Sequence, residues 1–338
     1  MIETGGNRPI YSVAFHPDGM HLLSGNKDGV RRWRVADGLE VGNRIEMDIV
    51  NAISVSRDGK WIVCGTEKGA SVWDAKIREK AIAVEGAEDV NAVDISPEST
   101  RFATAAGGHD DNKAASIWNI ITGERLVGPL QHDNCIIGIK FSPNGEHIAT
   151  AIVNRSIHVL DSRNGDQLIT IKTDIPGSWP STPLAWSNNG QQVFAASRGR
   201  KTKSFDVSTG SQLAESEPEE APGISIDLAT NGKFLAQGIS GDRSISFCDT
   251  STLTRIGPDS QYIYSIALSP DCSHVATGGR DGNITIRNLN NIPPDVYGPF
   301  CVSVSAFTIL SDTPHTVFPP PLDSPLGDYS GRTRIGKP

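Results

Sequence analysis

The sequence predicts an all-β fold in which one antiparallel unit is repeated seven times. Two observations lead to this prediction: turn-forming residues recur at regular intervals, and short apolar strands flank each turn. The turns end at residues 19, 59, 99, 145, 190, 232 and 272, so the steps are 40, 40, 46, 45, 42 and 40 residues. Such a period is typical of repeat arrays, in which a unit buries its apolar faces only against its neighbours.

The first unit shows the plan of all seven. Its first strand alternates apolar and polar residues and runs into His16-Pro17-Asp18-Gly19, where proline fixes φ and glycine tolerates positive φ. Asp-Gly pairs close the next two hairpins. Four strands are predicted, at residues 10–15, 21–25, 30–35 and 39–42. Some second strands contain a glycine where neighbouring sheets are expected to approach closely: Gly25, Gly65, Gly238 and Gly278.

The repeats divide the chain into one array, residues 1–292, and a tail, residues 293–338. The tail holds nine prolines and few charges, which predicts an extended, disordered segment. Residues 1–4 or 296–304 are candidates to complete the last unit, and we expect the sequence to be a piece of a longer protein. The units are predicted near residues 8–46, 47–86, 87–130, 131–174, 175–218, 219–258 and 259–292.

Composition restricts the class of protein. The net charge of -8 gives no overall attraction to nucleic acid or to an anionic membrane. The sequence shows no secretory signal and no apolar run of the roughly 20 residues that a membrane-spanning helix needs. Its five cysteines are dispersed without a CxxC pair, as expected for reduced thiols. We therefore predict a cytoplasmic protein, with the nucleus as the alternative.

The residues from Ile10 to Trp33 resemble a WD40 repeat, and similar residues follow in the other six units. This resemblance implies a seven-bladed β-propeller of four-stranded antiparallel blades around a central channel. The repeat motif is incomplete, because only one unit has a literal Trp-Asp pair and only one has the histidine expected before the first strand. The motif residues are Trp33, Trp73, Asp74, Trp118, His132, Asp161, Asp206 and Asp249.

Catalytic chemistry is not indicated by the sequence. The eight histidines show no metal-ligand spacing, and no nucleophile or phosphate-binding motif is present. His109-Asp110-Asp111 is the most metal-like cluster, but a solvated loop explains it better. The basic run at residues 198–203 lacks interleaved aromatic residues, so nucleic-acid binding is disfavoured. We expect no catalytic residue, no metal and no cofactor.

A partner-docking surface follows from the resemblance. WD40 propellers bind partners on the narrow face, where the first strand of each blade begins and the second hairpin turns. When the seven units are aligned, exposed aromatic and basic residues are expected to cluster around the contact between the last and first blades. This combination is typical of binding hot spots. The predicted docking residues are Tyr11, Lys27, Asn51, Glu67, Asn91, Arg198, Tyr264 and Arg280.

The predicted function is therefore a non-catalytic scaffold or recognition module that binds proteins or peptides on the narrow face. Acidic or phosphorylated peptides are the partner class that the tyrosine and basic residues suggest. One alternative is the partner-sensing part of a larger signalling NTPase-type protein. Another is a propeller hydrolase or lyase, which would be indicated by carboxylates or histidines with perturbed pKa values at the channel mouth.

Overall fold

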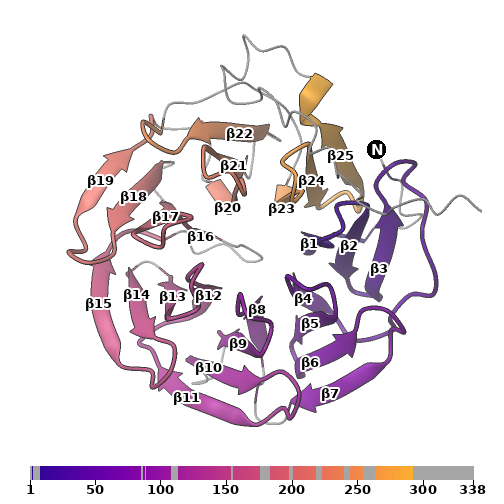
Figure 1. Ribbon diagram of the computed structural model, residues 1–338, viewed down its shortest axis with the longest axis horizontal. Helices are drawn as coiled ribbons and strands as arrows, with labels where there is room; N and C mark the ends of the chain where they lie inside the picture. Colours follow the sequence, from indigo (N-terminus) through magenta and orange to yellow (C-terminus); the bar gives the residue numbers. More distant parts are fainter. Residues whose placement is uncertain are drawn as a thin grey trace, which may run out of the picture. The chain divides into compact units, whose positions relative to one another are not determined.

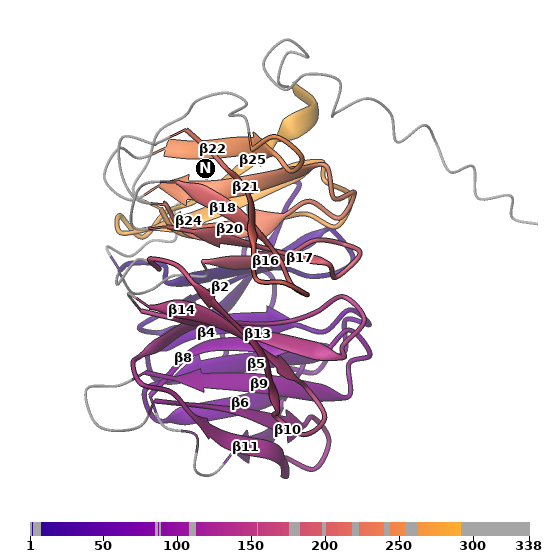
Figure 2. The same cartoon turned by 90° about the vertical axis from the view of Figure 1, so that its left-hand side faces the viewer.

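The computed structural model confirms the all-β fold and its seven blades. The described residues form seven antiparallel sheets around a central axis (Figure 1). Seen from the side, the strands run from one face of the ring to the other (Figure 2). The structure describes residues 2, 8–84, 87, 89–107, 113–153, 155–175, 183–197, 201–217, 223–239, 244–253 and 263–291. The predicted tail, the cluster His109-Asp110-Asp111 and the segment 296–304 lie outside these residues.

The second to fifth blades have the predicted four strands, ordered from the channel to the rim. Each strand pairs only with its sequence neighbours within the blade, so the hairpin turns alone determine this topology. The strands are β4 Val50–Val55, β5 Trp61–Thr66, β6 Gly69–Asp74, β7 Lys80–Val84, β8 Val90–Ile95, β9 Arg101–Ala106, β10 Ala114–Asn119, β11 Arg125–Gln131, β12 Ile136–Phe141, β13 His147–Ile152, β14 Ser156–Asp161, β15 Gln167–Lys172, β16 Leu184–Trp186, β17 Gln192–Ala196, β18 Thr202–Asp206 and β19 Gln212–Glu215.

The first, sixth and seventh blades have three strands each within the described part of the chain. In the first blade the predicted fourth strand is reduced to two isolated bridges, Trp33 with Glu40 and Val30 with Ile45. The bridge partners 40 and 45 are five residues apart in the sequence, whereas their partners 33 and 30 are only three residues apart. The residues therefore cannot pair one to one in a regular ladder. The strands are β1 Ser12–Phe15, β2 His21–Asn26, β3 Gly29–Arg34, β20 Gly223–Leu228, β21 Phe234–Ile239, β22 Ser244–Asp249, β23 Ile263–Leu268, β24 His274–Gly279 and β25 Ile284–Asn288, followed by the 3-10 helix η1 Leu289–Asn291.

The forty-residue period has a direct backbone cause. All seven turn-ending residues adopt positive φ, including the two that are not glycine, Ser99 at 61° and Cys272 at 57°. Only glycine adopts this region without steric cost, which explains why glycine ends the other five turns. The repeat therefore preserves a left-handed turn more strictly than it preserves a residue type.

The second-strand glycines lie where adjacent blades approach, as predicted. A Cβ atom at Gly278 would come within 2.4 Å of Cγ2 of Ile10 in the first blade. At Gly25 and Gly65 it would come within 2.6 Å of a valine side chain of the following blade. Each glycine thus makes room for a branched residue that precedes or begins the next inner strand.

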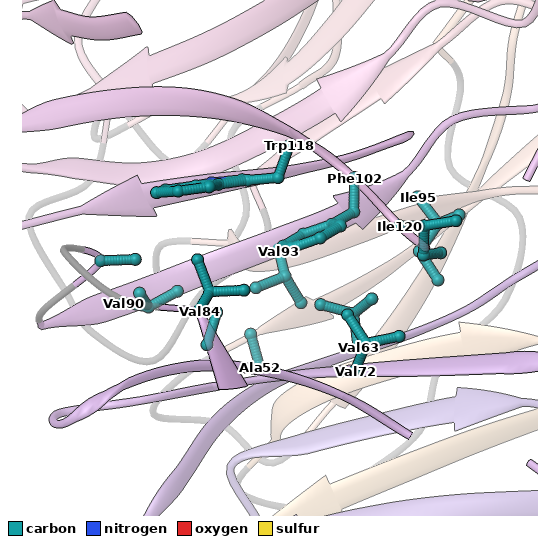
Figure 3. Packing of buried hydrophobic residues seen from close by; sticks show 12 residues of the cluster. Ala52, Val63, Val72, Val84, Val90, Val93, Ile95, Phe102, Trp118 and Ile120 are labelled. Atoms are coloured by element: carbon teal, nitrogen blue, oxygen red, sulfur yellow. The ribbon is translucent and has the colours of Figure 1, made fainter. Parts of the chain in front are cut away.

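The hydrophobic core is divided among the spaces between blades. Figure 3 shows one such cluster, in which Val63 and Val72 of the second blade face Val93 and Phe102 of the third. These four side chains are fully buried or nearly so. Because each cluster draws on two adjacent blades, no blade buries its apolar faces alone.

The ring closes where the seventh blade meets the first, a contact we call the closing seam and define by residues 10–15, β23 and β24. The amide of Ile10 donates to the carbonyl of Gly279 at 2.9 Å, and the amide of Val13 donates to Oγ of Ser265 at 3.0 Å. Farther out, Ile2 forms an antiparallel bridge with Ile284 of β25. The N-terminal segment, one of the two predicted candidates, therefore reaches the last blade.

Part of the polar network inside the repeats is retained. Nε1 of Trp33 donates to Oγ of Ser24 at 2.8 Å, and Nε1 of Trp118 donates to Oγ1 of Thr104 at 2.9 Å. In the second blade the position of Ser24 is occupied by Cys64, and Trp73 donates instead to Ser71 on its own strand.

The aspartates of the motif cap the turn after the third strand. Oδ1 of Asp74 accepts the amides of residues 76 and 77, at 2.8 and 3.0 Å. Asp206 and Asp249 accept the two equivalent amides of their own blades, and Asp161 accepts the amide of Arg163. Such side-chain to backbone bonds stabilise a tight turn without any binding role.

Candidate functional site

The structure brings together two tyrosines from opposite ends of the propeller. Tyr11 precedes β1 and Tyr264 is the second residue of β23, so both lie at the start of an inner strand. Their rings are stacked, with centroids 6.3 Å apart and an interplanar angle of 18°. Both side chains are half-buried. The closing seam therefore presents an aromatic pair at the end of the sheets where the inner strands begin, and we call these two residues the tyrosine pair.

A carboxylate lies at the same end of the sheets as this pair. Glu67 is exposed in the turn between β5 and β6 of the second blade, at the same end of the sheets as Tyr11. The pKa of Tyr11 is raised, first by burial, then by Tyr264 and then by the charge of Glu67. The electrostatic influence of Glu67 thus reaches the phenol group of Tyr11.

The other predicted docking residues occupy different environments. Lys27 and Arg280 are exposed in hairpin turns, at the end of the sheets where the inner strands begin, and Asn91 is half-buried in β8. Asn51 is only 4% exposed, and its Nδ2 donates to the carbonyl of Val90 at 3.1 Å. It therefore belongs to the contact between the second and third blades rather than to a docking surface. Arg198 lies outside the described residues.

The central channel contains charged residues that the sequence analysis did not single out. Nζ of Lys140 on β12 lies 3.1 Å from Oδ1 of Asp94 on β8. The charge of Asp94 is the main cause that raises the pKa of Lys140, and Asp227 on β20 contributes further. Burial in turn raises the pKa of Asp227. We call Asp94, Lys140 and Asp227 the channel triad.

Both aspartates of the channel triad also join blades. Oδ2 of Asp94 accepts the amide of Phe141 in the fourth blade at 2.8 Å. Oδ2 of Asp227 accepts the amide of Leu268 in the seventh blade at 2.7 Å. A comparison of the seven units could have revealed the triad, because small residues occupy the same position in the other four inner strands: Ala14, Ser54, Ala185 and Ala267.

His132 does not make the hydrogen bonds that its place in the motif predicts. Neither ring nitrogen has a hydrogen-bond partner, and the same holds for Oγ1 of Thr150. Leu160 occupies the place of the motif tryptophan, and the ring of His158 lies 5.1 Å from that of His132. Burial, followed by the influence of His158, lowers the pKa of His132 to about 4. The fourth blade therefore holds a neutral histidine in an apolar setting at neutral pH.

Within the described part of the chain, no group of three or more His, Cys, Asp or Glu side chains is arranged to hold a metal ion. The described residues also contain no helix long and apolar enough to cross a membrane.

Comparison with known families identifies the repeat. The family model described as "WD domain, G-beta repeat" matches residues 2–30, 45–74 and 250–288. These matches fall in the first, second and last parts of the ring, including both sides of the closing seam.

Curated relatives match between 45% and 83% of this chain at low identity. The mouse (Mus musculus) Intraflagellar transport protein 122 homolog is 21% identical over 288 residues, which are 83% of this chain and 23% of the relative. Transcription initiation factor TFIID subunit 5 of Caenorhabditis elegans is 27% identical over 242 residues, 69% of this chain and 36% of the relative. Small ribosomal subunit protein RACK1 of the same organism is 29% identical over 161 residues, 45% of this chain and 48% of the relative. This chain thus spans about a quarter of the length of the first of these relatives.

A solved structure shares the fold. Kuenenia stuttgartiensis Hydrazine Synthase superposes with a TM-score of 0.72 at 15% sequence identity, covering 83% of this chain and 95% of that chain. At this identity the likeness concerns the fold alone.

Proposed function

Because this chain is a WD40-repeat protein that folds as a seven-bladed propeller, we propose that it is a non-catalytic scaffold whose protein or peptide partners dock on the narrow face. The tyrosine pair is the proposed anchor of this surface. The proposed compartment is the cytoplasm or the nucleus. No cofactor is part of the proposal.

The stacking of Tyr11 on Tyr264 is the observation that carries the proposal. Tyrosines are enriched among the residues that dominate binding energy, since they offer a large apolar area together with a hydroxyl group. The pair lies at the start of two inner strands, where the curved ring places residues of different blades next to each other. Half-burial holds the rings in position while leaving part of each accessible.

Affinity purification from a lysate of the native cells tests the proposal. The intact chain is compared with the double variant Tyr11→Ala/Tyr264→Ala. The matched control is Leu168→Ala/Leu213→Ala, because these two side chains are 52% and 51% exposed on the outer strands β15 and β19. Thermal unfolding of all three proteins shows whether each variant keeps its fold.

We expect Tyr11→Ala/Tyr264→Ala, the seam variant, to lose partners that the wild type retains. Leu168→Ala/Leu213→Ala, the rim control, should retain them too. Removal of a hot-spot residue costs about 2 kcal/mol or more, so recovery of a partner should fall by about tenfold or more. An unchanged set of partners for the folded seam variant would contradict the proposal. Loss of partners only in the rim control would move the docking surface to the outer strands.

The channel triad is the observation that favours the alternative of a propeller enzyme, because it includes an aspartate with a raised pKa. Its geometry supports a structural role instead. Each carboxylate accepts a backbone amide of another blade, and Lys140 is paired with Asp94. A catalytic role would need a carboxylate that is released from these contacts to reach a substrate.

A further inference from the structure

The fourth blade contains buried polar atoms that its own hydrogen bonds do not use. Both ring nitrogens of His132 and Oγ1 of Thr150 are buried, and none of them bonds to any residue that the structure describes. Thr150 is fully buried, whereas the side chain of His132 is half-buried. Buried polar groups are almost always paired in folded proteins, so unpaired ones at a single place point to a ligand taken from solution.

A second histidine faces this group. His158 on β14 is the cross-strand partner of Thr150 on β13. Its ring centre lies 5.1 Å from that of His132, and the two ring planes are inclined at 53°. Strand alternation puts Thr150 and His158 on the same side of the blade as Ile148 and Leu160, which pack against the third blade.

The position of His132 is fixed by its backbone. Its amide donates to the carbonyl of Lys113 in the third blade at 2.8 Å. The two imidazoles therefore meet at the contact between the third and fourth blades. His158 is half-buried, so one side of the pair remains open to water.

Two imidazoles at this separation suit one metal ion. Zinc binds histidine nitrogens at about 2.0–2.1 Å in tetrahedral geometry, which places the centres of two bound rings about 5 Å apart. Burial lowers the pKa of both His132 and His158, so both rings are neutral at neutral pH. Only the neutral ring offers a lone pair to a metal, and the open side of the pair gives access to the water molecules that complete the coordination.

A second histidine pair, in the first blade, lacks these properties. The rings of His16 and His21 are 6.3 Å apart, and the Nδ1 atoms lie 2.9 and 2.7 Å from the same carboxylate oxygen, Oδ2 of Asp18. Nη2 of Arg32 is 3.8 Å from that oxygen. Both Nδ1 atoms are thus engaged, and the charge of Arg32 opposes a cation.

We propose that His132 and His158 bind a divalent transition-metal ion of the zinc class at the contact between the third and fourth blades. The ion ties the segment before β12 to the third strand of the same blade and is structural. This site departs from the expectation of no metal, which rested on ligand spacing along the sequence. The fold, not local spacing, brings these two histidines together.

Isothermal titration of the intact, chelator-treated chain with zinc chloride tests the site. His132→Gln and His158→Gln each remove one imidazole. His147→Gln is the matched control in the same blade, and His21→Gln tests the pair in the first blade. Thermal unfolding without metal shows whether each variant is folded, and unfolding with zinc shows whether the bound ion stabilises it.

We expect the wild type to bind one zinc ion, and each of His132→Gln and His158→Gln to bind it at least about tenfold more weakly. The rise of Tm with zinc should be lost in the same two variants, while His147→Gln and His21→Gln should behave as the wild type. If His132→Gln does not fold, His158→Gln decides alone. Absence of binding to the wild type at millimolar zinc would overturn the proposal, as would unchanged binding to folded His158→Gln. Binding lost only in His21→Gln would also overturn it and would place the ion in the first blade.

Discussion

The contact between the third and fourth blades contains charged and titratable groups, whereas the closing seam is held by backbone bonds and apolar packing. The first contact includes the Asp94–Lys140 pair, and Arg101 donates to the carbonyls of Gly145 and Ser162. At the seam, the polar contacts given above are joined by a cluster of buried apolar side chains that includes Ile10, Val13 and Ala276. The tyrosine pair stacks across this seam, and both rings stay half-buried.

This difference bears on function. A contact between consecutive blades is supported by the chain itself, but no strand connection joins the last blade to the first. The seam is therefore held by side-chain packing, by the hydrogen bonds given above and by the bridge between Ile2 and Ile284. Residues at the seam can thus serve binding while buried neighbours maintain closure.

Acidification should produce the largest effect, and it should act through His132 of the fourth blade, whose amide donates to the carbonyl of Lys113 in the third blade at 2.8 Å. Its pKa is lowered to about 4 in the folded state, against about 6.5 when unfolded. The neutral form is favoured by folding, so this contribution to stability is complete above pH 6.5 and is lost as the pH falls toward 4. The upper limit of this contribution to the free energy of unfolding is about 3 kcal/mol.

Urea unfolding at several pH values checks this prediction. His132→Gln should lose less free energy of unfolding between pH 6.5 and 4 than the wild type. His147→Gln, whose ring stacks on Trp186 in the next blade, serves as the control and should keep the wild-type acid loss. If the wild type and His132→Gln lost the same free energy of unfolding between pH 6.5 and 4, His132 would not be the source of acid sensitivity. The distinction between the two contacts would then not hold.

Gly278→Ala should break the seam by overpacking. Its Cβ would lie 2.4 Å from Cγ2 of Ile10 and 3.1 Å from Cγ1 of Val13, so the blades must move apart. We expect a loss of about 2 kcal/mol in the free energy of unfolding. In the double variant Gly278→Ala/Ile10→Ala the two losses should be less than additive, because the second change removes Cγ2 of Ile10, the closest clashing atom, although Cβ of residue 10 stays 2.9 Å away. Full additivity in urea unfolding would show that the close approach does not hold the seam.

The smallest expected effect concerns the two turn-ending residues that are not glycine, one in the third blade and one in the seventh. Ser99→Gly should raise the free energy of unfolding by about 1 kcal/mol, because glycine relieves the cost of positive φ. Cys272→Gly should gain less, since Sγ of Cys272 lies 3.0 Å from Oγ1 of Thr230. Gly190→Ser, at the same turn position with φ of 69°, is the reverse control and should lose stability. A gain from Gly190→Ser in thermal unfolding would contradict the backbone explanation of the repeat.

The repeat made most of the fold predictable, because a turn depends on local residues. An Asp-Gly pair such as Asp18-Gly19 indicates a turn with positive φ from the local sequence alone. Seven such turns at similar spacing indicate seven blades. The pairing of Tyr11 with Tyr264 followed from the same register once the ring was assumed to close. The reduced fourth strand of the first blade was not predictable, because it depends on how residues 40–45 meet β3.

The electrostatic features of the candidate site were predicted less well. Lys27 and Arg280 are predicted to lie around the tyrosine pair, and this stays a prediction, whereas Glu67, another predicted docking residue, contributes to the raised pKa of Tyr11 after burial and Tyr264. Register identifies which residues share a face but does not determine how far a long side chain extends across it. Asn51 shares that register yet is buried by its bond to the third blade.

The central claim, that partners dock over the closing seam, is tested most directly by site-specific photo-crosslinking in cells. A photoreactive phenylalanine analogue is placed at Tyr264, next to the first blade, and at Leu213 on the outer strand β19. We predict crosslinked partners from position 264 and none from position 213. Crosslinks from position 213 alone would contradict the claim and would place the interaction on the rim of the propeller.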